Sequence, residues 1–247
     1  MPKTLITKLI SCFVLLLICK TALAQLNNDT SIYNQGLINL VNQFNNNIGQ
    51  AAKIYNGFVY TNYDSGIQGN PYLDELNSWQ TGSVDYDGQV FEGVSMQYDI
   101  YADQVIVSLA NNLGPMRLIS DKVTGFDLHH HHFVRIASSD LGVKSGFFDQ
   151  LYGGRSQVVN KIAKALIASS GQSRTERYFQ PVQDYHQYFI MKDKHYHHVD
   201  ELGSVLNLFK DKKKELKKYI KDNNIQFNGL REYGLAAIAA EYDRLTK

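Results

Sequence analysis

Cysteine is almost missing from this chain. Two are present, Cys12 and Cys19, and both lie within the first 24 of its 247 residues. If those residues are removed on export, the mature chain has no thiol, which excludes disulfides, thiol catalysis and redox exchange. We therefore expect the mature protein to be held together by an ordinary hydrophobic core.

The first 24 residues have the organisation of a secretory signal peptide. Lys3 and Lys8 give a positive start, residues 10–18 form a short apolar stretch, and residues 22–24 (Ala-Leu-Ala) suit a signal peptidase. Two alternatives stay open. One is a membrane anchor, although the stretch is shorter than the ~20 residues of a spanning helix; the other is a lipoprotein signal with Cys19 as the lipidated residue. We expect cleavage and export to the periplasm or the cell exterior.

Three further absences narrow the function. No apolar run after the leader is long enough to span a bilayer, so we expect no transmembrane segment in the mature chain. Without the three lysines of the leader, 22 basic residues face 24 acidic ones, which argues against a nucleic-acid partner. The G-x-S-x-G, G-x-x-x-x-G-K and H-E-x-x-H patterns are also missing, so the sequence shows no familiar catalytic motif.

The hydrophobic period changes along the chain and divides the mature part into segments. Residues 25–55 predict a polar lead-in and then a helix, because apolar residues recur every three or four positions from about residue 31. Residues 56–199 have a period of two, as in Val94–Ile100, with turn sequences such as Asp87-Gly88 between the runs. Residues 200–247 return to the helical period and are rich in lysine.

This pattern predicts an α+β fold. We expect an antiparallel β-rich body of about eight to ten strands joined by hairpins, as a curved sheet, a sandwich or a partly open barrel. An N-terminal helix precedes the β body, and the C-terminal helices pack on the same domain. Asp200 is the expected N-cap of the first C-terminal helix.

Histidine is the residue type that most suggests chemistry. Residues 129–132 are four consecutive histidines within a predicted strand, so His130 and His132 share a face in this interpretation. His195 and His197 share a face of a later strand. Such imidazoles can hold a Zn²⁺ or Cu²⁺ ion, so these four residues are the candidate metal ligands. Additional ligands would come from Asp127, Asp149 or His198. The alternative is structural: half-buried strand histidines that form hydrogen bonds with their neighbours.

Carboxylates, tyrosines and lysines give weaker signals. Asp85 with Asp87, and Asp99 with Asp103, are close in sequence, and a hydrolase of the glycosidase type needs two carboxyl groups ~5–10 Å apart. The many tyrosines of the β region would either pack in half-buried strands or form a surface for sugars or peptides. The lysines of residues 210–221 would face solvent or make a weak contact with the cell envelope.

Several short segments are distinctive when taken together: Tyr55-Asn56-Gly57, Gly82-Ser83-Val84, Tyr86-Asp87-Gly88, Val94 to Asp99, Gly146-Phe147-Phe148, Tyr152-Gly153-Gly154, and Tyr188 to Leu216. They resemble a group of uncharacterised secreted proteins of Gram-negative bacteria, and the likeness covers most of the mature chain. The group has no assigned activity, so the resemblance implies export but no catalytic residues.

We therefore expect an exported, non-enzymatic accessory, binding or structural protein of the periplasm or cell surface. Its partner would be an unknown protein or small molecule, and no catalytic or cofactor-binding residue is assigned. Two alternatives stay open: a Zn²⁺- or Cu²⁺-binding protein that uses His130, His132, His195 and His197, and a hydrolase with dispersed carboxylates.

Overall fold

The computed structural model describes residues 35–40, 43, 53–109, 114–137, 142–170, 175–227 and 231–247. The chain divides into two units, residues 1–52 and 53–247, and each is described by itself. In the first unit, residues 35–40 and 43 are helical, as predicted; the signal peptide and the rest of the predicted helix up to residue 52 lie outside the described residues. None of the helices in the described ranges has the length and apolar character needed to cross a membrane.

The second unit is built on one sheet of 12 strands. The strands follow the order β1-β6-β5-β4-β3-β7-β8-β9-β10-β11-β12, and each neighbouring pair on this path is antiparallel. The short strand β2 pairs with β11 in parallel. Because the path has two ends, the sheet is open, which confirms the predicted antiparallel β-rich body.

The strands are β1 (Phe58–Val59), β2 (Ile67–Gln68), β3 (Gln80–Tyr86), β4 (Gln89–Asp99), β5 (Gln104–Ser108), β6 (Pro115–Arg117), β7 (Val123–Leu128), β8 (His131–Ile136), β9 (Gly146–Tyr152), β10 (Val158–Ser170), β11 (Thr175–Lys192) and β12 (His195–Val199). The number exceeds the eight to ten that we expected. Two strands, β1 and β2, have two residues each, which is too short for an alternating pattern to be visible in the sequence.

Tight turns join neighbouring strands, and one of them is the predicted Asp87-Gly88 turn. Asp87-Gly88 joins β3 to β4, with φ of 54° and 76°, and this two-residue geometry matches the twist of the flanking strands. Asp193-Lys194 joins β11 to β12 with φ of 52° and 65°. The β9–β10 connection contains Gly153-Gly154.

The four histidines do not continue one strand. Because β7 ends at Leu128 and β8 begins at His131, His129 and His130 form the turn of a hairpin, and His129 has a φ of 60°. Our single strand through residues 128–136 was therefore wrong. Histidine tolerates the left-handed conformation better than most residues, so this turn carries no glycine or proline to announce it.

Three helices follow the last strand: α2 (Leu202–Leu208), α3 (Lys213–Asp222) and α4 (Arg231–Leu245). Short 3₁₀ turns are η2 (Lys53–Tyr55), η3 (Leu73–Glu75), η5 (Ser120–Lys122) and η7 (Lys210–Lys212). The N-cap of α2 is Glu201 rather than Asp200, and the Ser204 hydroxyl accepts a hydrogen bond from the Glu201 N–H.

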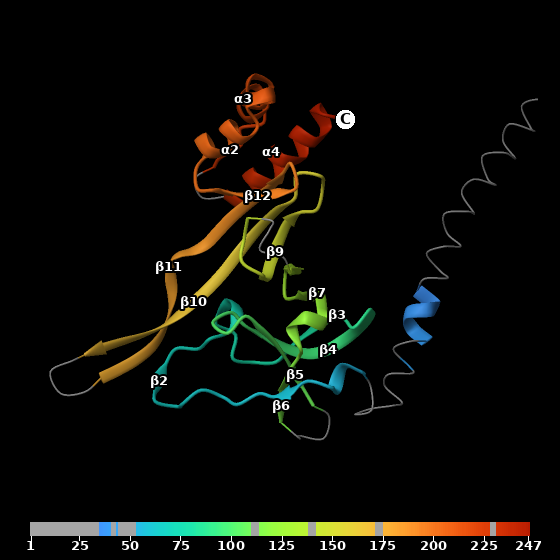
Figure 1. Ribbon diagram of the computed structural model, residues 1–247, viewed down its shortest axis with the longest axis vertical. Coiled ribbons are helices and arrows are strands. Elements are labelled where there is room, and N and C mark those ends of the chain that lie inside the picture. The colour runs from blue at the N-terminus through green and yellow to red at the C-terminus, as the bar shows by residue number, and fades with distance from the viewer. Residues whose placement is uncertain are drawn as a thin grey trace, which may run out of the picture. The chain divides into compact units, whose positions relative to one another are not determined.

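The helices cover one face of the sheet at the β9–β12 end (Figure 1). Val158, Tyr188 and Ile190 of the sheet pack with Leu235 and Ile238 of α4, and we call this side of the sheet the helix face. The far end of the long β10–β11 hairpin projects away from the helices (Figure 1). A second cluster lies on the opposite face and comprises Ile136, Val143, Phe148, Val159 and Tyr196.

Candidate functional site

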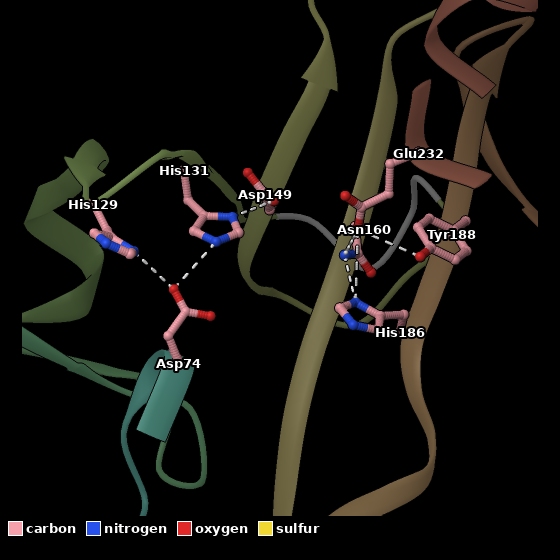
Figure 2. A network of polar contacts seen from close by, with 8 residues as sticks. All are labelled: Asp74, His129, His131, Asp149, Asn160, His186, Tyr188 and Glu232. Carbon is pink, nitrogen blue, oxygen red and sulfur yellow. Dashed lines mark hydrogen bonds and ion pairs between the residues drawn. The ribbon is translucent and has the colours of Figure 1, made fainter. Parts of the chain in front are cut away.

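A row of polar side chains crosses the helix face from β8 to β11. The register pairs Phe133 with Asp149, Asp149 with Asn160, and Asn160 with Tyr188. Residues directly opposite each other in paired strands share a face, and so do residues two apart in one strand. His131 and His186 therefore join the same row. We call the following eight residues the helix-face network: Asp74, His129, His131, Asp149, Asn160, His186, Tyr188 and Glu232 (Figure 2).

One half of the network is an imidazole held between two carboxylates. His131 Nδ1 lies 2.7 Å from Asp149 Oδ2, and its Nε2 lies 3.5 Å from Asp74 Oδ2. His129 Nδ1 contacts the same Asp74 oxygen at 3.0 Å. The hydrogen bond with Asp149 raises the pKa of His131, burial opposes the shift, and the charges of Asp149 and Asp74 add to it. His131 is therefore stabilised as the cation.

Asp74 belongs to a strained segment that lies against this part of the helix face. Asp74 and Glu75 have φ of 53° and 56°, a left-handed conformation that costs free energy in residues other than glycine. The buried Lys164, whose side chain is 1% exposed, pairs with Glu75 Oε1 at 2.6 Å. Its ammonium also donates to the carbonyl oxygens of Asn70 at 2.8 Å and Tyr72 at 3.0 Å. Residues 70–76 are thus fixed by Lys164 on one side and by two histidines on the other.

The other half of the network is centred on a buried amide. Asn160 is fully buried, and its Nδ2 lies 2.8 Å from His186 Nδ1 and 3.2 Å from Glu232 Oε1. The Tyr188 hydroxyl donates to the same glutamate oxygen at 3.4 Å. The opposite atom of the amide, Asn160 Oδ1, is buried and has no hydrogen-bond partner among the described residues. We call Asn160, His186 and Glu232 the amide triad.

The pKa values of His131 on β8 and His186 on β11 shift in opposite directions. Burial lowers the pKa of His186, although the charges of Glu232, Asp149 and Asp74 oppose that shift. The positive charge of His131 adds to the lowering. Burial also raises the pKa of Tyr188 to about 12, with a contribution from Glu232, so its hydroxyl remains a hydrogen-bond donor. His186 therefore presents a neutral ring to the amide, while His131 carries the charge.

The opposite face of β3, β7 and β8 contains a shallow groove of ≈ 330 Å³. Here His132 Nδ1 lies 2.6 Å from Asp127 Oδ1, and Ser83 donates to the other oxygen of Asp127 at 2.7 Å. Asp85 and Glu92 also line the groove. Hydrogen bonds from His132 and Ser83 lower the pKa of Asp127 despite partial burial.

The structure does not bring the four predicted metal ligands together. His130 lies in the β7–β8 turn, His132 points to the opposite face, and His195 and His197 lie on β12. Three strands separate β8 from β12, so at ~4.8 Å per strand the two segments are ~19 Å apart. Among the residues that the structure describes, no three His, Cys, Asp or Glu side chains form a group that could hold a metal ion.

Three of the four paired carboxylates of the sequence have side-chain partners, whereas Asp85 Oδ1 is buried and has none among the described residues. Asp99 is fully buried and accepts hydrogen bonds from the hydroxyls of Tyr60 at 3.0 Å and Tyr63 at 2.8 Å. Asp103 pairs with Lys161 at 2.9 Å. Asp87 pairs with Lys122 at 3.2 Å. The contacts of Asp99 explain this buried acid as a part of the fold.

Sequence reasoning identified part of the helix-face network. Asp149 was considered as an extra metal ligand and His129 and His131 belonged to the histidine run, but Asp74, Asn160, His186 and Glu232 were not recognised. These four come from separate elements, and only the register of β9–β11 and the packing of α4 bring them together. Comparisons of this chain with protein-family models, curated proteins and solved structures find no match.

We predict that His131 makes stability depend on pH. Because the folded-state pKa of His131 lies above the unfolded value of about 6.5, its contribution is fully present below about pH 6.5. The contribution is lost as the pH rises through the higher folded-state pKa. The difference in urea midpoint between the native protein and His131→Gln should therefore be larger at pH 6 than at pH 9. Parallel pH profiles for the two proteins would contradict this interpretation.

Lys164→Met should destabilise the protein. The change keeps most of the side-chain volume but leaves the carbonyl oxygens of Asn70 and Tyr72 without their donor. We expect a loss of about 2–3 kcal/mol in the free energy of unfolding, measured by urea denaturation. Glu75→Gln is the matched control and should cost less than about 1 kcal/mol, because Glu75 is largely exposed. Equal losses for the two variants would show that Lys164 acts mainly through its ion pair.

Proposed function

We propose that this chain is an exported, non-enzymatic binding protein of the periplasm or cell surface, and that its ligand is bound at the helix-face network. The observation that carries the proposal is the fully buried Asn160, whose Oδ1 has no partner among the described residues. A buried polar atom without a hydrogen bond costs about 1–3 kcal/mol, so its presence calls for a reason other than stability.

The charges around Asn160 indicate the chemistry of the ligand. Three carboxylates act on the His186 ring in the sense that favours positive charge: Glu232, Asp149 and Asp74. The unpartnered Oδ1 is itself an acceptor. Burial and the positive charge of His131 act in the opposite sense and leave the pKa of His186 lowered. Hydrogen-bond donors therefore complement the unpartnered acceptor.

A hydrolase is less well supported by the same residues. The carboxylates of Asp74 and Asp149 do approach one another, but the His131 imidazole lies between them and contacts both. A glycosidase pair instead leaves space between its two carboxyl groups for the sugar and the attacking water. The network thus resembles a fixed ion-pair arrangement more than an acid–base pair.

Thermal unfolding in the presence of a small ligand panel tests the binding function. The panel contains primary amines, neutral sugars, and monovalent and divalent cations, each at millimolar concentration. A ligand present at 100 times its dissociation constant stabilises the folded state by about 2.7 kcal/mol. For a domain of this size, that corresponds to an increase in Tm of about 5–10 °C.

We expect at least one class to stabilise the native protein and to lose its effect on Glu232→Gln, whose side chain is partly exposed and replaceable without a cavity. His132→Gln is the matched control on the opposite face and should respond as the native protein does. A binding function at this network is rejected if no class changes the Tm of the native protein. It is also rejected if every class that raises the Tm of the native protein raises the Tm of Glu232→Gln by the same amount.

A further inference from the structure

We propose that the free edge of strand β10 pairs with the same edge of a second copy of this chain, so that two copies form an antiparallel dimer. The free edge is the side of residues 161–170 that faces away from β11. This inference concerns the far end of the β10–β11 hairpin. It goes beyond the binding function proposed above and does not depend on it.

One side of β10 lacks a neighbouring strand over most of its length. On the side of β11, β10 is paired from Val158 to Ser170. On the side of β9, the pairing ends at Asn160, and no other described strand pairs with residues 161–170. The far end of the hairpin also stands clear of the helices (Figure 1). An edge of this kind offers a row of backbone N–H and C=O groups to another strand.

The two edges of the hairpin differ in how they are protected. The edge of β11 is covered by β2, which pairs with it at Arg177 and Tyr178. Arg177 Nη2 also pairs with Asp64 Oδ2 at 2.5 Å, which ties the segment before β2 to β11. On β10, residues 165–169 (Ala-Leu-Ile-Ala-Ser) contain neither a charge nor a proline, the residues with which proteins commonly protect an exposed edge. The edge of β10 is therefore the one that invites a partner.

The nearest charged residues of β10 do not repel an approaching strand. The side chain of Lys164 is 1% exposed, and its ammonium pairs with Glu75 Oε1 at 2.6 Å. The ammonium of Lys161 lies 2.9 Å from Asp103 Oδ2 and donates to the Phe147 carbonyl oxygen at 2.9 Å. Both positive charges are thus engaged within their own chain, so a second β10 meets no free cation beside the edge.

The sequence of the edge suits pairing with its own copy. In a two-fold symmetric antiparallel pair, opposed residues share a face of the sheet, so one residue lies opposite its own copy. Ile167 is 37% exposed and is the residue that we place there. Leu166 then lies opposite Ala168 of the second copy, and Ala165 lies opposite Ser169. Every one of these pairs is uncharged, and the two isoleucines, with Cβ atoms about 4.5–5.5 Å apart, cover each other.

Pairing also supports a part of the sheet that has few neighbours. A two-stranded ribbon by itself is marginally stable in water, and β2 adds only Ile67 and Gln68 to the far end of the hairpin. Two hairpins joined edge to edge form a four-stranded antiparallel sheet in the order β11-β10-β10-β11. Because the other side of each β10 is already occupied by β11, the assembly closes at two copies.

Sedimentation velocity of the purified protein from about 1 to 100 μM tests the dimer. We expect the native protein to dimerise, and Ile167→Lys to dimerise at least ten-fold more weakly, because it places two like charges opposite each other. Gln180→Lys is the matched control, since it adds the same charge at an exposed residue of β11 in the same hairpin, and it should dimerise as the native protein does. A native protein that stays monomeric throughout this range, or an Ile167→Lys variant that dimerises as tightly as the native protein, would overturn the proposal.

An exchange of charge tests the register. Ile167→Glu alone should be as weak a dimer as Ile167→Lys, whereas an equimolar mixture of the two should dimerise more tightly than either, because opposite charges then face each other. Circular dichroism checks that each variant is folded, which we expect because the Ile167 side chain is partly exposed. If the mixture dimerises no more tightly than the separate variants, pairing around Ile167 is rejected.

A synthetic peptide of residues 161–170 distinguishes a second copy from a strand of another protein. In the dimer the edge is occupied, so we expect the peptide to compete with dimer formation. A native protein that is monomeric at every concentration and still binds the peptide would show an edge open to other strands. That result would overturn the choice of a second copy as the partner.

Discussion

The structure depends on the register of four neighbouring strands, β8 to β11. That register places Asn160 opposite Asp149 on one side and opposite Tyr188 on the other, in a face that is otherwise covered by the C-terminal helices. A slip of one residue would move every polar side chain of β10 to the other face. Val158 and Ile190, which pair with each other two residues along on the same face, are fully buried and fix the register. Packing in the helix-covered core therefore positions the polar network.

The buried polar side chains of the sheet fall into two kinds. Lys164 and Asp99 are fully engaged by partners, so they tie loop residues to the sheet and need no ligand to account for them. Asn160 differs, because one of its two amide atoms is engaged and the other is not. The contrast separates buried groups whose polar atoms all have partners from the two described residues with an unpartnered buried atom, Asn160 and Asp85, of which Asn160 lies in the helix-face network.

Much of the fold follows from local sequence, whereas the site does not. Alternation and turn residues such as Asp87-Gly88 predicted the antiparallel hairpins, and the return of the helical period predicted the C-terminal helices. The histidine turn at His129 was missed because its residues resemble their strand neighbours. The network was missed for a different reason: Asn160, His186 and Glu232 carry no motif and lie 26 or more residues apart. Only the pairing of β10 with β11 and the packing of α4 bring them together, and single-sequence patterns do not encode such long-range contacts.

The most direct test of the account is a crystal structure of the protein grown with the member of the ligand panel that raises its Tm most. The account predicts that the ligand contacts the helix-face network and forms a hydrogen bond with Glu232, His186 or Asn160. A ligand seated only in the groove beside His132 and Asp127, with the helix-face network unchanged, would contradict it.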